Sequence, residues 1–353
     1  MQTISSVQVL RAIAALSVVA CHYGLFYSQS LGNPKALTAL AFGEAGVDLF
    51  FVISGFIMVY ASQTLYGQPG APMTFFTRRV IRIVPLYWLA TTAYLLLAIA
   101  LPDFEKGRGA DFVIASYLFI PFPRPDGSMQ PLVGQGWTLN YEMLFYAIFA
   151  IAVFAPRRIA VIGASLVVGA IGIAGALVPF TNPILDFWTN PIIIEFAFGM
   201  LIGLAYLEGF RLPGWLGWSL LLGGLALFLA SIQMRDLFGG RLLPWGLPAA
   251  AAIAGATLGG VTLSGTIWSG FVLIGEASYA LYLTHTIAVR GLIALFGRLG
   301  IELPFWPGLA FAVALSVVLA LAIYYAFERP VTRALRNVAA IHAKRKSVAA
   351  MVT

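Results

Sequence analysis

The sequence contains few charged residues: Asp, Glu, Lys and Arg make up 10% of its 353 residues, whereas a typical soluble domain has about 25%. Hydrophobic residues make up 60%, and the mean hydropathy is +0.91. A chain with so few polar side chains cannot cover its own surface in water. The composition therefore excludes an ordinary soluble protein and predicts a protein embedded in a lipid bilayer.

Cysteine is nearly absent, since Cys21 is the only one in the chain. A single thiol excludes an internal disulfide framework and a metal site built from several cysteines, and we expect no metal. The residues that precede Cys21 resemble a lipoprotein cleavage site, but the first ten residues carry no Lys or Arg. A secretory signal has its positive charge there, so we expect this segment to remain as a helix.

Long apolar segments fill most of the chain. A helix needs about 20 mostly apolar residues to span a bilayer, and tryptophans cluster near the ends of such segments here, which is typical of membrane interfaces. We predict an all-α polytopic bundle of about ten transmembrane helices within residues 1–330, followed by a basic cytoplasmic tail, 331–353. The expected spans are residues 7–26, 43–62, 85–101, 137–154, 158–178, 187–206, 214–230, 245–260, 268–296 and 305–327, with 110–120 re-entrant or interfacial.

The distribution of Lys and Arg predicts the orientation. Cytoplasmic loops carry an excess of positive charge, and a cytoplasmic N-terminus puts most basic residues on that side. An even number of spans then leaves both termini in the cytoplasm. The net charge of +7 fits this topology, so we expect no nucleic-acid partner. The residues on the cytoplasmic side would be Arg78, Arg79, Arg82, Arg157, Arg158, Arg211, Arg329, Arg333, Arg336, Lys344, Arg345 and Lys346.

Two polar residues share one face of the first expected span. Arg11 and His22 are eleven residues apart, which places them on the same side of a helix and about 16 Å apart along its axis. A cation near the cytoplasm could hold a phosphate, and an imidazole deeper in the membrane could move a proton. The alternative is an arginine that reaches the interface and a histidine that makes one hydrogen bond.

Other ionisable residues also lie within the expected spans, where a charge costs a few kcal/mol and usually serves a function. In the topology above, Asp48, Glu142 and His285 reach the depth of His22. A carboxylate at that depth would orient the imidazole and stabilise its cation, so Asp48 and Glu142 are the candidate catalytic partners. Each acid could instead be part of a structural ion pair.

Four further polar residues remain open to two interpretations. Glu195 follows Pro191, so it lines a cavity or compensates for an interrupted helix. Glu276 lies nearer the cytoplasm and could pair with Arg11, which favours a structural role. Ser278 and Tyr282 accompany His285 on one face and would contact substrate or bond to other helices. The remaining intramembrane cation is Arg290.

A basic segment precedes the third span. In Arg78-Arg79-Val80-Ile81-Arg82-Ile83-Val84-Pro85, two of the arginines are three residues apart and would share a face if the segment were helical. The segment either clamps a phosphate or only retains positive charge on the cytoplasmic side. The charge itself does not distinguish these alternatives.

Taken in order, several motifs resemble those of the acyltransferase family 3 membrane enzymes, which O-acetylate bacterial exopolysaccharides, lipopolysaccharides and related sugars. They extend over nearly the whole chain, and the exopolysaccharide enzymes are the most similar group. The motifs are Arg11 followed after ten residues by His22, then 46–56 (GVDLFFVISGF), 78–85 (RRVIRIVP), 136–142 (GWTLNYE), 278–285 (SYALYLTH) and Glu328-Arg329-Pro330.

The resemblance implies an acyl-CoA donor, expected to be acetyl-CoA, that enters from the cytoplasm, and a glycan or lipid-linked sugar acceptor outside the bacterial inner membrane. The donor's phosphates would contact Arg11, Arg78, Arg79 and Arg82, and its thioester would lie near His22. We predict that His22 is the general base, with an acetyl-histidine intermediate as the variant. Glu195, Ser278, Tyr282 and His285 would contact substrate.

The rival class is a proton-coupled transporter or flippase. Buried acids and the interrupted sixth span suit such a protein, but no internal repeat supports it.

Overall fold

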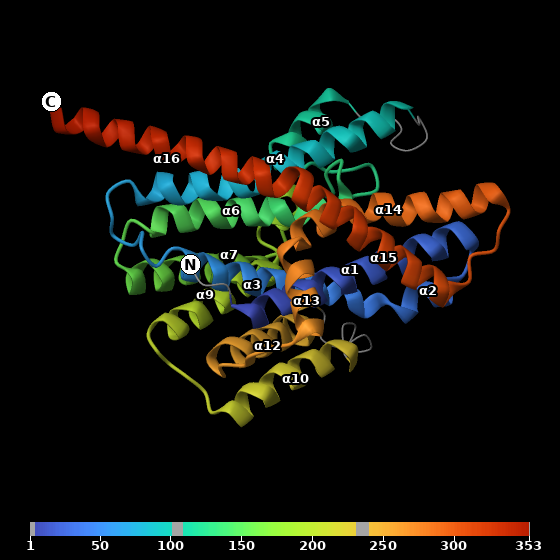
Figure 1. Cartoon of the computed structure of the whole chain (residues 1–353), viewed down its shortest axis with the longest axis horizontal. Coiled ribbons are helices and arrows are strands. Elements are labelled where there is room, and N and C mark those ends of the chain that lie inside the picture. The colour runs from blue at the N-terminus through green and yellow to red at the C-terminus, as the bar shows by residue number, and fades with distance from the viewer. Residues whose placement is uncertain (1–3, 101–108, 231–239, 353) are drawn as a thin grey trace.

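The computed structural model describes residues 4–100, 109–230 and 240–352, and every element within these ranges is a helix. The prediction of an all-α membrane protein is therefore confirmed. Most of the long helices lie side by side in one bundle (Figure 1). Figure 1 also shows α16 extending from the bundle toward the end at which the N-terminus lies.

The described helices follow one another in this order. The first half contains α1 (Ser5–Leu31), α2 (Pro34–Ala39), η1 (Ala41–Ala45), α3 (Gly46–Ala61), α4 (Ala71–Ala100), α5 (Ala110–Tyr117), η2 (Gly134–Gly136), α6 (Trp137–Ala152) and α7 (Arg157–Leu177). The second half contains α8 (Pro183–Trp188), η3 (Pro191–Ile193), α9 (Ile194–Leu207), α10 (Gly214–Ala230), η5 (Leu242–Gly246), α12 (Leu247–Leu258), α13 (Thr266–Glu276), α14 (Ser278–Leu299), α15 (Phe305–Ile323), η6 (Tyr324–Glu328) and α16 (Arg329–Val352).

Seven helices in the described ranges are long and apolar enough to cross a membrane. Three expected spans, 137–154, 214–230 and 245–260, form the shorter helices α6, α10 and α12, which have 16, 17 and 12 residues. The polytopic architecture is thus confirmed, whereas the number ten and the side on which the termini lie stay predictions. The seven are Ser5–Leu31, Ala41–Ala61, Ala71–Ile99, Arg157–Leu177, Pro183–Leu207, Ser278–Leu299 and Phe305–Ile341.

The basic segment before the third span is helical. It lies inside α4, a helix of 30 residues that continues through Pro85. Proline removes a backbone donor and usually kinks a helix. The neighbouring helix α14 is joined to α4 close to this proline, because the hydroxyl of Tyr279 donates to the carbonyl of Ile83 at 2.7 Å. The arginines of this segment therefore have fixed directions relative to the bundle.

The expected span 268–296 is wrong as one helix, because it breaks at Ala277 into α13 and α14. Figure 1 shows α13 running across the direction of α14. The reason is close packing on α1: a Cβ on Gly275 would lie 2.0 Å from the carbonyl oxygen of Gln8. The segment 331–353 is also helical as far as residue 352, since α16 continues from η6.

Glycine allows α3 and α9 to approach each other closely. A Cβ on Gly55 would lie 2.2 Å from the oxygen of Phe196, and one on Gly199 would lie 2.0 Å from the oxygen of Val52. Small residues at helix contacts are the usual means of packing in membranes. Next to this contact, Phe51 stacks on Phe196 with ring centroids 4.5 Å apart.

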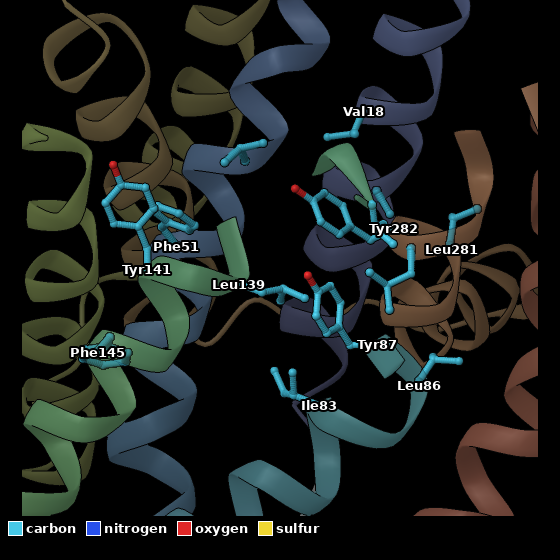
Figure 2. Packing of buried hydrophobic residues seen from close by; sticks show 14 of the residues in the cluster. Val18, Phe51, Ile83, Leu86, Tyr87, Leu139, Tyr141, Phe145, Leu281 and Tyr282 are labelled. Carbon is cyan, nitrogen blue, oxygen red and sulfur yellow. The ribbon is translucent and has the colours of Figure 1, made fainter. Parts of the chain in front are cut away.

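The aromatic cluster around this contact extends across the bundle. Figure 2 shows Phe51, Tyr141 and Phe145 on one side of the buried cluster, and Tyr87 and Tyr282 on the other. The α3–α9 contact thus fixes the position of the group that contains Phe51.

We expect Gly199→Ala to destabilise the protein. The added methyl group has no room against the α3 backbone, and such overpacking typically costs about 1–3 kcal/mol. The matched control is Gly223→Ala on α10, where a Cβ would meet nothing within 4 Å. Thermal unfolding in detergent should show a melting temperature lowered by several degrees for the first variant alone. Equal melting temperatures for both variants would contradict the close contact.

Candidate active site

One cavity, here called the basic cavity, lies between α1, α3, α4, α6 and α14. It brings together six of the residues singled out from the sequence, from four different helices. Residues with separate expected roles, for the donor, the chemistry and the acceptor, therefore share one space. The six are Arg11, Arg79, Arg82, Glu142, Ser278 and Tyr282, and Ser54 and Tyr146 also line the cavity.

The charges that line the basic cavity are mainly positive. Glu142 is its one lining carboxylate, and it accepts hydrogen bonds from Ser54 and Tyr146, each at 3.0 Å. Arg82 is ion-paired with Glu328 at 2.7 Å. The Nε atom of Arg79 is buried and has no hydrogen-bond partner among the described residues.

An anion in the basic cavity would satisfy this unmet positive charge. Guanidinium groups offer planar pairs of N–H donors that match phosphate oxygens, so a phosphate group fits this end of the cavity.

Two expectations about the cations are not met. The side chain of Arg78 is exposed and does not line the basic cavity, although its neighbour Arg79 does. The expected pair between Arg11 and Glu276 does not form. Arg11 donates to Gln8 at 3.3 Å, and Glu276 accepts from Tyr324 at 3.3 Å, because the helix break at Ala277 directs Glu276 elsewhere.

The imidazole of His22 is paired with a second imidazole. His285 Nε2 lies 3.1 Å from His22 Nδ1, and the ring centroids are 4.9 Å apart. His22 is partly exposed, whereas His285 is fully buried. The expectation that a carboxylate orients His22 is therefore not matched, because the ring nitrogen in contact with it belongs to His285.

The hydrogen bonds of the pair assign its tautomers. His285 Nδ1 lies 3.0 Å from the carbonyl of Leu281, and a carbonyl only accepts, so that nitrogen carries a proton. In a neutral ring His285 Nε2 then accepts. His22 Nδ1 must donate, either to His285 or to the carbonyl of Val18 at 3.1 Å. His22 Nε2 is left with a free lone pair, as a general base requires.

Tyr282 connects the basic cavity with the histidine pair. Its ring lines the cavity and lies 6.2 Å from the ring of His285, centroid to centroid. Its hydroxyl donates to the carbonyl of Gln135 at 3.0 Å and lies 3.0 Å from the hydroxyl of Thr138. The cavity thus extends from the arginines of α1 and α4 to a tyrosine that touches the pair.

Asp48 belongs to a different cluster. Both of its carboxylate oxygens accept from Arg241, at 3.2 and 2.6 Å, and Asp48 is fully buried. Arg241 also donates to the carbonyl of Glu44 at 3.1 Å. The interpretation of Asp48 as the partner of His22 is not supported by this geometry.

Arg241 is a residue that the sequence analysis overlooked. A buried carboxylate needs a cation, and a search for an unassigned arginine beside the expected spans would have found it.

Glu195 lies beside this ion pair, away from the basic cavity. It is fully buried, interacts electrostatically with Asp48 and Arg241, and its carboxylate oxygens have no hydrogen-bond donor among the described residues. The interrupted helix at Pro191 is capped instead by Asn190, whose side chain accepts from the Ile192 N–H at 3.1 Å. Compensation of the kink is therefore not the role of Glu195.

The acyltransferase domain family, Acyl_transf_3, matches residues 4–325. The chain belongs to the acyltransferase 3 family. The acyltransferase is 37% identical over 301 residues to "Exopolysaccharide production protein ExoZ" of Rhizobium meliloti (strain 1021), covering 82% of this chain and 90% of that protein. It is 26% identical to "Acyltransferase MdmB" of Streptomyces mycarofaciens, over 88% of this chain and 85% of the other. No solved structure matches.

Family membership confirms the resemblance drawn from the motifs, and the structure shows what these motifs share. Arg11, Arg79 and Glu142 come from three motifs that are far apart in the sequence, yet all line the basic cavity. Glu328, from the last motif, pairs with Arg82 of the same cavity. The motifs of the acyltransferase thus meet around one space in the membrane domain.

We expect Asp48→Asn to destabilise the acyltransferase, because the Arg241 guanidinium loses the carboxylate that accepts two of its hydrogen bonds, and breaking a buried ion pair typically costs about 3–5 kcal/mol. Asp48→Asn combined with Arg241→Gln should recover part of this loss, because the guanidinium is removed together with its partner. Thermal unfolding of the single and double variants checks this. A single variant that is as stable as the wild type but inactive would instead assign Asp48 to the chemistry.

Proposed function

We propose that this acyltransferase transfers an acyl group, most simply acetyl, from cytoplasmic acyl-CoA to a sugar hydroxyl on the far side of the bacterial inner membrane. The observation that carries the proposal is the basic cavity, which runs from three guanidinium groups to Tyr282 beside the His22–His285 pair. An exopolysaccharide or similar glycan is the proposed acceptor, supported by the similarity to the exopolysaccharide production protein of Rhizobium meliloti.

The proposed donor fits the charge of the cavity. Coenzyme A carries phosphates at one end and its thioester at the end of a long, flexible arm. Arg11, Arg79 and Arg82 would bind the phosphates, and the arm would extend past Tyr282 toward His22. Arg78 is left out of this set because its side chain is exposed. Glu142 would act from within the cavity by holding Tyr146 and Ser54 in place.

The proposed reaction uses the free lone pair of His22 Nε2. His22 takes the proton from the sugar hydroxyl as the oxygen attacks the thioester carbonyl carbon, and His285 Nε2 accepts from the Nδ1–H of the resulting imidazolium. The C–S bond then breaks, and the imidazolium returns its proton to the departing thiolate. The products are a sugar ester and free coenzyme A. In the variant, His22 Nε2 attacks the thioester first and passes the acyl group on.

Membrane lipid is the remaining partner of this proposal. Arg329, Arg333 and Arg336 are exposed at the beginning of α16 and would lie against anionic headgroups if that helix is cytoplasmic. The transporter alternative depended on buried acids and the interrupted sixth span. Asp48 is ion-paired, and the chain belongs to an acyltransferase family, which favours acyl transfer over transport.

We expect His22→Ala to lower acyl transfer by roughly 10²–10⁴-fold, the usual contribution of a general base. The assay measures release of free coenzyme A from acetyl-CoA and transfer of radiolabelled acetyl to a glycan extract. His342→Ala, which changes the third histidine of the chain, is the control and should have wild-type activity.

His285→Gln should retain more activity than His285→Leu, because the glutamine amide oxygen still accepts from His22. Full activity in His22→Ala would rule out both forms of the mechanism. Full activity in His285→Leu would rule out only the histidine relay.

We expect Arg79→Gln to raise the KM for acetyl-CoA by roughly 10- to 100-fold, the effect of losing one charge-assisted hydrogen bond to a phosphate. The matched control, Arg78→Gln, removes the same charge from the exposed neighbour and should leave this KM nearly unchanged. Initial-rate kinetics at saturating acceptor measures both. Equal increases in the two variants would indicate that only the general positive charge of α4 matters.

A further inference from the structure

A second cavity, here called the aromatic cavity, lies between the segment before α6, the beginning of α6, α8, η3 and the residues around the beginning of η5. The proposed donor site does not account for it. Its aromatic side chains are Trp137, Tyr141 and Phe187, and its polar ones include Gln130, Asp186, Asn190 and Arg241.

The aromatic side chains form a rigid wall. Trp137 meets Tyr141 edge to face with centroids 5.9 Å apart, and Tyr141 stacks on Phe187 at 4.4 Å. The Tyr141 hydroxyl donates to the Phe187 carbonyl, which fixes α6 to α8. Trp137 is the ring of this wall that is partly exposed, so it offers a flat apolar surface to a ligand.

The polar side chains lie around this surface. Asp186, Asn190 and Gln130 are exposed, and they come from the region of α8 and from the segment before α6. A carboxylate and amides beside an indole ring suit a pyranose sugar, whose apolar C–H face packs on an aromatic ring while its hydroxyls hydrogen-bond at the edges. A lipid tail could not form hydrogen bonds with these polar groups, and a phosphate would be repelled by the carboxylate of Asp186.

The aromatic cavity lies next to the proposed reaction site. Trp137 and Tyr141 line it, whereas Thr138 and Leu139 of the same helical turn line the basic cavity, so the first turn of α6 separates the two spaces. Phe51 also lies at this boundary, and its ring centroid is 6.4 Å from that of Trp137.

The two sites also lie at a similar depth. Gln135, two residues before Trp137, donates to the Leu283 carbonyl at 2.9 Å and to Thr286 at 3.2 Å. These two residues flank His285. Trp137 and the histidine pair therefore lie at a similar level of the bundle, on either side of the first turn of α6.

We infer that the aromatic cavity binds a sugar unit of the acceptor glycan, with Trp137 as its stacking surface and Asp186 as its main hydroxyl acceptor. The inference rests on the proposed function and adds a site for the acceptor. Arg241 at the rim ties this site to the buried Asp48 on α3. The sugar could belong to a finished polymer or to a lipid-linked precursor.

The test is direct binding, measured without any acyl-CoA. Saturation-transfer-difference NMR would be recorded on the protein in lipid nanodiscs, with de-O-acetylated oligosaccharides from the host exopolysaccharide as the probe. A parallel sample would use the lipid-linked sugar fraction of the membranes, which distinguishes the two sources. The variants are Trp137→Ala and Asp186→Asn, and the controls Trp306→Ala and Glu302→Gln alter exposed residues outside the cavity.

Wild type and both controls should bind at least one of the two probes, and Trp137→Ala should lose the signal. Asp186→Asn, an exposed substitution that leaves the packing intact, should raise the KM for the acceptor about tenfold. Its KM for acetyl-CoA should not change. Unchanged binding in both variants would overturn the inference.

The wild-type result separates this inference from the proposed function. Absence of binding to either probe, together with acetyl-CoA turnover that depends on His22, would overturn the sugar site and leave the donor half standing. Absence of both sugar binding and His22-dependent turnover of acetyl-CoA would overturn the proposed function as well.

Discussion

The cost of burying charge in a medium with little water governs this structure. Each ionised side chain inside the bundle needs a partner, since an isolated charge would cost several kcal/mol. Asp48 has Arg241, Glu328 has Arg82, and Glu142 has two hydroxyl donors. Where this compensation is incomplete, as at Nε of Arg79, the structure offers a site to a charged ligand.

The same rule explains how much the sequence could predict. The apolar segments and the positions of basic residues were sufficient for the membrane class and the all-α fold, because a helix is the way in which a single segment satisfies its backbone in lipid. Six of the eleven residues proposed for the site line one cavity. Depth in the membrane follows from the expected topology and from the position of each residue within its span, which do not depend on how the helices are arranged laterally.

Lateral pairing could not be predicted in this way. Asp48, Glu142 and His285 seemed equivalent as partners of His22, since all three were expected at one depth. Only packing separates them: α3 meets α9 and the region of η5, which brings Asp48 to Arg241, while α14 packs on α1 and brings His285 to His22. The break at Ala277 was missed for a related reason, because its cause is the contact of Gly275 with Gln8 on α1, a neighbour far away in the sequence.

That break also shapes the proposed chemistry. Were 268–296 one helix, the contact of Gly275 with Gln8 would fix the rotation of the whole segment about its axis. Because the chain turns at Ala277, α13 packs across α1 while α14 is free to adopt its own rotation. Glu276 then accepts a hydrogen bond from Tyr324, and His285, nine residues later, contacts the imidazole of His22. The proposed relay between two histidines on different helices therefore depends on the helix break at Ala277.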